Sequence, residues 1–221
     1  MPPPAVLVEA AVVSVEEAAA ALEAGAGRLE LCRDLPTGGL TPGWSLLQAV
    51  RERMAGEVPV FAMIRPRDGD FVYTRAEVAA MRKEIREAER SGADGVVLGC
   101  LRPDGRVDSA ALAALVDEAR GLPVTFHRAF DATPSAIGAL EDVIRAGVAR
   151  VLTSGHAPTA SLGADVLAEL VRVAAGRVTV LPGGTVRGEN VRRLVASTAA
   201  VEVHARAAAV SGIRAALDRR D

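Results

Sequence analysis

Short apolar runs rich in β-branched residues alternate along the chain with alanine-rich stretches that have helical spacing. The runs begin roughly 22–37 residues apart, which is the length of a strand, a turn and a helix together. Eight runs are present, over residues 5–11, 28–32, 58–66, 95–100, 123–130, 150–155, 178–184 and 201–205. Because the runs are apolar on both faces, they predict parallel strands covered by helices.

Helix-capping residues between the runs support the same pattern. Thr74 and Glu77 have capping-box spacing, and Asp108 can cap a helix that runs to about residue 120. Thr41 and Thr133 each precede a proline, which predicts an N-cap followed by proline at the first helical position. Glycine follows five of the predicted helices, at positions 25, 92, 121, 147 and 176, where a helix end requires positive φ.

Eight strand–helix units predict a single (β/α)8 TIM barrel over residues 1–221, because an open doubly wound sheet normally uses about five or six strands. The last unit is shortened, since only residues 207–221 remain for the closing helix. Half of the residues are hydrophobic and the net charge is −2, which excludes a disordered chain.

Charged residues interrupt strands whose lumen-facing positions should be aliphatic, where an unpaired ion is costly. Residues two apart share a face of a strand, and strand 8 closes against strand 1, so these positions form one arc if they face inward. We therefore expect a functional site at the C-terminal end of the barrel, with Glu30 paired to Arg65. The candidate catalytic residues are Glu9, Glu30, Arg65, His127 and His204, and Glu202 lies in the same arc.

Small residues and hydroxyls in the turns after strands 6 and 7 predict an anion site, because barrels commonly bind phosphate there. Backbone N–H groups of Gly183 and Gly184, the Ser154 hydroxyl and the Arg206 charge are the expected donors, with Gly155 shaping the turn. The alternative is that these glycines serve only tight turns.

The two cysteines, Cys32 and Cys100, are too few for a disulfide framework and are expected to be thiols in a reducing cytoplasm. Both lie at the C-terminal ends of predicted strands, and together they are the candidate ligands for Cu(I). Strand 3 separates them, which favours buried small side chains over a shared copper site. No basic cluster predicts a nucleic-acid partner, and no apolar run is long enough to predict a membrane span.

At these residues the chain resembles the CutC family of copper homeostasis proteins. The matching segments are RLELC (28–32), GGLTP (38–42), MIRPR (63–67), GDFVY (69–73), GADGVVLG (92–99), TFHRAFD (125–131), LTSG (152–155) and LPGG (181–184). The resemblance implies a TIM barrel, a cytoplasmic setting, copper binding and homo-oligomers. It places the family's polar pocket on Glu9, Glu30, Arg65, His127, Arg128, Asp131 and His204, and its copper-associated cysteine on Cys32.

This sequence departs from the family pattern at three places. Ala11 replaces a cysteine usual near the end of the first strand, and Val13 replaces an acidic residue just after it. Ala205 and Arg206 replace a Gly-Ser pair, so an anion site there would be lost or rebuilt around Arg206.

Three functions follow from these observations. The first is a cytosolic copper-binding homeostasis protein, which rests on the resemblance. The second is an enzyme that acts on a small anionic or phosphorylated metabolite, with Glu9, Glu30 or His127 as acid or base and Arg65 as anion clamp. The third is an interaction scaffold with a vestigial site.

Overall fold

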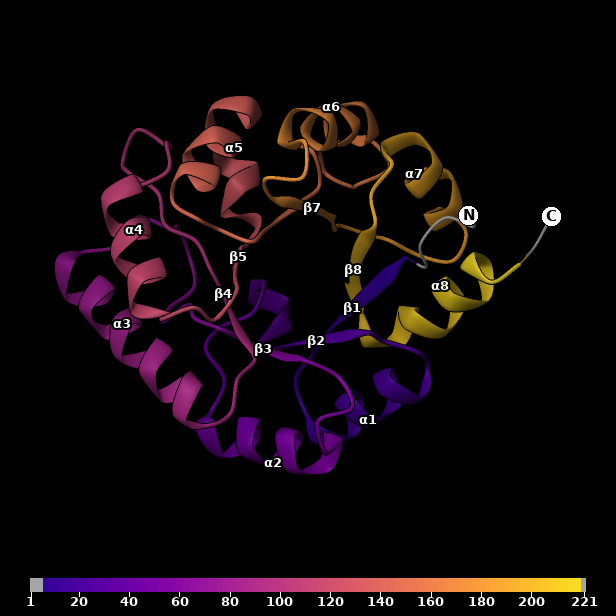
Figure 1. Ribbon diagram of the computed structural model, residues 1–221, viewed down its shortest axis with the longest axis horizontal. Helices are drawn as coiled ribbons and strands as arrows, with labels where there is room; N and C mark the ends of the chain where they lie inside the picture. The colour runs from indigo at the N-terminus through magenta and orange to yellow at the C-terminus, as the bar shows by residue number, and fades with distance from the viewer. Residues whose placement is uncertain (1–5, 220–221) are drawn as a thin grey trace.

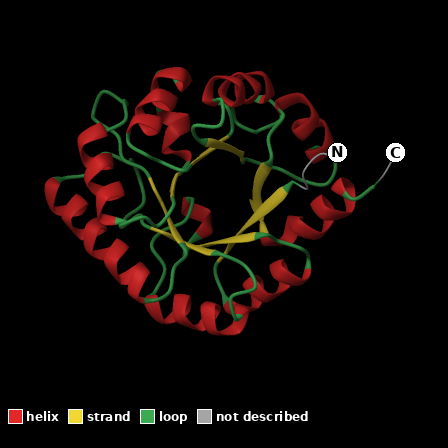
Figure 2. Cartoon of the chain, viewed as in Figure 1, coloured by secondary structure: helices red, strands yellow, loops and turns green. Residues whose placement is uncertain are grey.

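The computed structural model describes residues 6–219, and within them eight parallel strands form a ring surrounded by helices (Figure 1). The strands are β1 (Leu7–Val12), β2 (Arg28–Leu31), β3 (Val60–Met63), β4 (Gly95–Leu98), β5 (Val124–Phe126), β6 (Arg150–Thr153), β7 (Thr179–Pro182) and β8 (Glu202–Arg206). Hydrogen-bonded neighbours follow the order β7-β6-β5-β4-β3-β2-β1-β8. β7 and β8 lie side by side and close the ring (Figure 2), so the predicted TIM barrel is confirmed.

A helix follows each strand and covers the outside of the barrel (Figure 2). The helices are α1 (Val15–Glu23), α2 (Trp44–Met54), α3 (Arg75–Arg90), α4 (Ser109–Glu118), α5 (Ala136–Arg145), α6 (Ala164–Ala174), α7 (Val191–Thr198) and α8 (Val210–Leu217). Short 3-10 helices are η1 (Leu35–Thr37), η2 (Arg128–Ala132) and η3 (Ala207–Ala209). None of the helices within residues 6–219 is long and apolar enough to cross a membrane.

Two of the predicted helix caps are wrong by two residues. Gly43 caps α2 and Ser135 caps α5, so the two prolines precede the caps. The Thr41 hydroxyl instead donates to Glu84, and the Thr133 hydroxyl donates to the Phe130 carbonyl. A tertiary hydrogen bond at Thr41 and a local one at Thr133 therefore use the side chains that were expected to cap helices. The Thr74–Glu77 capping box on α3 and the Asp108 cap on α4 are confirmed.

The strand pleat separates two kinds of interior. On β1, Val8, Ala10 and Val12 pack in the main core between sheet and helices, while Glu9 faces the lumen. A small lumen cluster consists of Cys32, Phe61, Met63 and Val97, with Val13 and Leu35 packed against it. The lumen is therefore only partly aliphatic, and charged side chains fill the remainder.

Candidate active site at the mouth of the barrel

The floor of the lumen is an ion network that includes Arg28, which opens β2. Its Nε donates to Glu9 and its Nη2 lies 2.5 Å from Glu202 Oε2. Arg150 Nε lies 3.2 Å from the same Glu202 oxygen. The Phe61 ring packs against both guanidinium groups, with its centroid 5.3 Å from Arg28 Cζ and 5.1 Å from Arg150 Cζ. Two arginines and two carboxylates thus balance their charges, as buried ions require.

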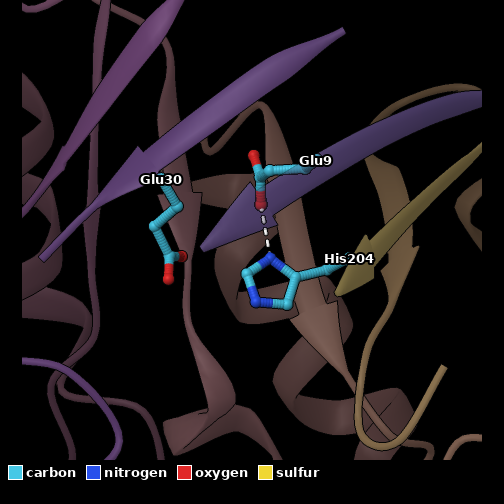
Figure 3. Close-up of side chains that lie close together, drawn as sticks. All are labelled: Glu9, Glu30 and His204. Atoms are coloured by element: carbon cyan, nitrogen blue, oxygen red, sulfur yellow. Dashed lines mark hydrogen bonds and ion pairs between the residues drawn. The ribbon is translucent and has the colours of Figure 1, made fainter. Parts of the chain in front are cut away.

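Above this floor, Glu9 holds the imidazole of His204 in place. Strand register sets the two residues opposite each other, and His204 Nδ1 lies 2.8 Å from Glu9 Oε1 (Figure 3). Burial opposes ionisation of Glu9, but the hydrogen bond with His204 and the charge of Arg28 outweigh it and hold the Glu9 pKa at about 2. An ionised Glu9 accepts the Nδ1 proton, so Nε2 is the His204 nitrogen left for a ligand.

Glu30 lies beside the His204 ring, on the left of Figure 3. Its side chain is buried, and its Oε2 has no hydrogen-bond partner among the described residues. Burial raises the pKa of Glu30 to about 7. Burial lowers the pKa of His204, but the carboxylates of Glu30 and Glu9 outweigh that effect and raise it above its ordinary value. Glu30 and His204 therefore form a pair that can hold or release a proton near neutral pH.

The expected pair between Glu30 and Arg65 is wrong. Arg65 Nη1 donates to the carbonyls of Thr37 (2.7 Å) and Gly39 (3.1 Å), and Nη2 donates to the carbonyl of Gly69 (3.1 Å). Carbonyl dipoles fix the guanidinium without cancelling its charge. Arg65 therefore brings a positive charge to the cavity wall, as the anion-clamp role requires.

His127 follows β5 and points into the same cavity. Burial and the charge of Arg65 lower its pKa to about 3, so the ring is neutral at physiological pH. Phe71 packs against it, with ring centroids 5.0 Å apart. His127 is thus a neutral imidazole on the wall across the barrel from β1, which carries Glu9.

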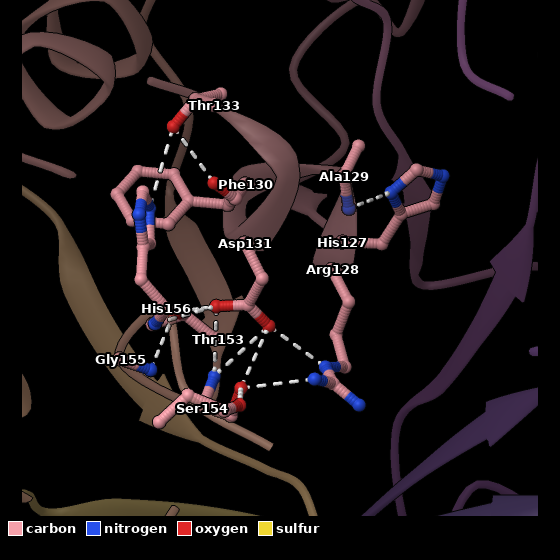
Figure 4. Close-up of polar contacts among 11 residues, drawn as sticks. His127, Arg128, Ala129, Phe130, Asp131, Thr133, Thr153, Ser154, Gly155 and His156 are labelled. Atoms are coloured by element: carbon pink, nitrogen blue, oxygen red, sulfur yellow. Dashed lines mark hydrogen bonds and ion pairs between the residues drawn. The ribbon is translucent and has the colours of Figure 1, made fainter. Parts of the chain in front are cut away.

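Asp131 and Ser154 form a hydrogen-bonded support for Arg128, which we call the Asp131 bracket (Figure 4). Asp131 accepts hydrogen bonds from the Thr153 hydroxyl, the backbone N–H groups of Ser154 and His156, and Arg128 Nε. The Ser154 hydroxyl lies 2.5 Å from the Ala157 carbonyl oxygen and accepts from Arg128 Nη2. Ser154 is fully buried and does not line the cavity, so it positions Arg128 and does not serve as the expected anion donor.

The glycine turns also differ from expectation. The Gly183 N–H donates to the Thr153 carbonyl, and a Cβ at Gly183 would lie 2.5 Å from Leu152 Cδ1, so the turn packs closely against that side chain. Gly155 N–H donates to the Thr153 hydroxyl and is likewise engaged. Gly184, at φ +98°, lines the cavity. Of the residues expected to donate hydrogen bonds to an anion, only Gly184 and Arg206 therefore line the cavity.

These side chains surround a cavity of about 440 Å³ at the C-terminal end of the strands. Its basic lining residues are Arg65, Arg128, Arg187 and Arg206, and its acidic lining residue is Glu30, with His127 and His204 on the wall. Four guanidinium groups against one carboxyl, whose pKa burial raises, make the cavity suited to an anion. The Arg206 side chain makes no hydrogen bond or ion pair with residues 6–219, so it is available to a ligand.

The two cysteines lie on opposite sides of the barrel wall. Cys32 belongs to the lumen cluster and donates to the Val12 carbonyl, whereas Cys100 lies in the outer core and donates to the Asp108 carbonyl. Burial raises the pKa of Cys100 to about 12 and lifts that of Cys32 far above its ordinary value. Because Cu(I) favours two or more soft thiolate ligands, these separate, protonated thiols do not fit a shared copper site.

One other group of side chains has metal-like spacing. One ligand atom each from Glu9, Glu30 and His204 lie within 4.8 Å of one another. However, both carboxylate oxygens of Glu9 already bind other residues, Arg28 and His204, and neither is free for a metal ion. Glu30 and His204 remain as the members with free positions, and we interpret them as a proton-carrying pair.

Sequence reasoning missed Arg28, Arg150 and Phe61, which support the site from below, and also Phe71 and Arg187. Arg28 shares the parity of Glu30, so its inward orientation was readable from the strand pattern. Phe71 and Arg187 lie in loops, where no periodic pattern indicates which side chains turn inward.

Comparison with known proteins gives consistent results. The model of the CutC family matches residues 6–209. A CutC family protein of Xanthomonas campestris pv. campestris is 48% identical over 199 residues, which cover 90% of this chain and 82% of the relative. The mouse copper homeostasis protein cutC homolog is 44% identical over 210 residues, covering 94% of this chain and 76% of that protein.

Solved structures agree at the level of the backbone. The crystal structure of CutC from Streptococcus agalactiae superposes with a TM-score of 0.86 at 28% identity, over 90% of this chain and 97% of that one. A thiamine phosphate pyrophosphorylase from Pyrococcus furiosus reaches a TM-score of 0.67 at 15% identity, over 96% of both chains. A likeness at that identity shows the shared barrel fold alone.

Proposed function

This chain belongs to the CutC family, and we propose that within it the protein is an enzyme that transfers protons on a small anionic molecule bound at the barrel mouth. The observation that carries the proposal is Glu30. A buried carboxyl with an unpartnered Oε2 stands beside His204, in a cavity whose other charged residues are arginines. Burial without a partner is costly for stability, which favours a functional role for the group.

The residues divide the work between binding and proton transfer. Arg65, Arg128 and Arg206 attract and orient the anion, and the Asp131 bracket fixes the direction of Arg128. Glu30 takes or gives the proton, because a pKa of about 7 leaves both of its forms populated near neutral pH. Glu9 keeps the His204 Nε2 facing the ligand.

Ligand-induced thermal shift tests the anion site. Phosphate should raise the melting temperature of the wild-type protein above the effect of chloride at equal ionic strength. Arg206→Ala should remove most of that gain, because the side chain faces the cavity without a partner. Arg53→Ala, an exposed arginine on α2, is the matched control and should retain it. A wild-type protein that responds equally to phosphate and chloride would show that the cavity is not an anion site.

Copper binding is a second candidate, suggested by the name that the mouse relative carries. The lumen-facing thiol of Cys32 favours it, and the distance of Cys100 from that cluster opposes a tight site. We also propose the cytoplasm as the setting, because two free thiols suit a reducing compartment. Homo-oligomer formation, implied by the family resemblance, stays a prediction that light scattering can check.

A further inference from the structure

The ring of His127 is fixed in one orientation and one tautomer. The backbone N–H of Ala129 donates to its Nδ1 at 3.1 Å. A Cβ at Gly99 would lie 2.6 Å from the ring, so the imidazole packs directly over a residue without a side chain. Because Nδ1 accepts a hydrogen bond, a neutral ring must carry its proton on Nε2.

The Nε2–H of His127 has no partner among residues 6–219, although the side chain is buried. Figure 4 shows Nε2 on the side of the ring away from Ala129. The residue lines the cavity, and the Nε2 atom itself is buried at that wall. A donor that is oriented, neutral and unsatisfied is suited to an oxygen acceptor of the ligand.

A second donor stands next to it. Arg65 uses its terminal nitrogens on three carbonyls, whereas its buried Nε makes no hydrogen bond, although Arg65 also acts on the nearby Tyr73 hydroxyl. The Phe71 ring contacts both groups, with its centroid 5.0 Å from Arg65 Cζ and 5.0 Å from the His127 centroid. One aromatic ring therefore holds the two unpartnered donors on the same wall of the cavity.

The proton-transfer residues face this wall from across the barrel. β2 and β8 flank β1, and β5, which leads to His127, is the strand farthest from β1 in the ring. Glu30 and His204 come from β2 and β8. Because all of these side chains line one cavity, a small molecule bound there would meet the oxygen donors from one wall and the carboxylate base from the other at neighbouring atoms.

We propose that His127 Nε2–H and Arg65 Nε–H form a subsite for a carbonyl oxygen, and that the substrates are small anionic α-hydroxycarbonyl compounds. The inference rests on the proposed function, since it uses Glu30 as the base. The carboxylate Oε2 of Glu30 takes the proton from the carbon next to the carbonyl, as that C–H bond breaks. The electron pair forms a carbon–carbon double bond while the carbonyl π electrons move to the oxygen, where the two donors stabilise the enolate. Return of the proton completes the exchange with no further reactant.

A pair of ligands that differ only at the carbonyl tests the subsite. Dihydroxyacetone phosphate and sn-glycerol 3-phosphate carry the same phosphate, but the first has a carbonyl where the second has an alcohol. Calorimetry should show that the wild-type protein prefers the carbonyl ligand by about tenfold, the typical effect of one oriented hydrogen bond. His127→Phe should abolish the preference and leave glycerol phosphate binding within about twofold.

The control is Arg53→Ala, an exposed arginine on α2 that does not line the cavity and should leave the preference unchanged. Equal binding of both ligands by the wild-type protein would overturn the carbonyl subsite while the anion site stands. Failure of both ligands and of inorganic phosphate to bind would overturn the proposed function as well. In ²H₂O, exchange of the carbon-bound protons of dihydroxyacetone phosphate, lost in Glu30→Gln, would report the proton transfer itself.

Nitrogen-15 NMR supplies a test on the wild-type protein without any ligand. The chain has three histidines, so the imidazole signals are few. His127 should show a neutral ring protonated at Nε2 from about pH 5 to pH 8. An imidazolium, or a ring protonated at Nδ1, would remove the donor and overturn the proposal.

Discussion

His204 Nδ1 lies 2.8 Å from Glu9 Oε1, and the two residues stand opposite each other in the β1–β8 register. Arg28 holds the other Glu9 oxygen, so the imidazole is fixed to the barrel wall through a carboxylate that is itself fixed. This chain of contacts connects the floor of the lumen to the proton-carrying pair at the mouth. Damage to the floor should therefore reach the site.

Glu9→Gln tests this connection. The amide keeps the shape of the carboxylate but removes the charge that balances buried Arg28, so the free energy of unfolding should fall by about 3 kcal/mol or more. Urea denaturation of the variant measures the loss. Glu169→Gln, which breaks an exposed pair with Arg172 on α6, is the control and should change stability little. Equal effects of the two substitutions would contradict a central role for Glu9.

The pKa of Glu30 predicts how stability varies with pH. Because the folded-state pKa is raised to about 7 from 4.5, the folded protein binds more protons than the unfolded chain between these values. The contribution of Glu30 is thus fully present below about pH 4.5 and is lost as the pH rises through 7. Glu30→Gln mimics the protonated form, so its stability relative to wild type should increase from pH 5 to pH 8. Melting temperatures across this range would contradict the assignment if the difference stayed constant.

Asp131→Ala should destabilise the protein more than Arg128→Ala does. Asp131 accepts from two backbone N–H groups and from the Thr153 hydroxyl, and these buried donors would lose their partner, at a cost of about 2 kcal/mol or more. The Arg128 side chain is 45% exposed, so its removal costs mainly ligand binding. Denaturation curves for stability and phosphate titrations for binding separate the two roles. The reverse order of stabilities would show that Asp131 is not the centre of the bracket.

Copper binding should be measurable but weak, and should depend on Cys32 more than on Cys100. Cys32 is in the lumen near Glu30, whereas Cys100 lies behind the strand wall. Competition against a chromophoric Cu(I) chelator should show reduced binding in Cys32→Ser and little change in Cys100→Ser. Tight one-to-one binding abolished equally by both substitutions would mean that the two thiols converge after all.

The strand pattern was sufficient to predict the barrel, and it grouped Glu9, Glu30 and His204 in one arc on condition that they face inward, because residue parity depends only on local geometry. Residue parity could not show whether Glu30 and Arg65 are close enough to form an ion pair. Register places Phe61 opposite Glu30, and Arg65 comes four residues later, about 13 Å further along the strand direction. Register depends on the pairing of whole strands, which local patterns do not reveal.

The turns after β6 and β7 show why two of the predicted anion-binding residues were wrong. Ser154 and Gly183 have the composition of an anion site, yet internal acceptors and close packing use them. A hydroxyl or an N–H near the end of a strand can serve the protein or a ligand, and composition does not distinguish the two. The partners of Asp131 settle the question, because they come from a strand and a loop more than 20 residues away in sequence.

Beneath the site, the buried side chains of Glu9, Arg28 and Phe61 fill the lumen, and the cavity opens at the C-terminal mouth above them. Substrate and product must then use the same opening, so a new substrate molecule can bind only after the product has left. A reaction with a single substrate, such as a rearrangement within one molecule, is compatible with a shared opening for substrate and product. A reaction that requires a second bulky substrate is not compatible with it.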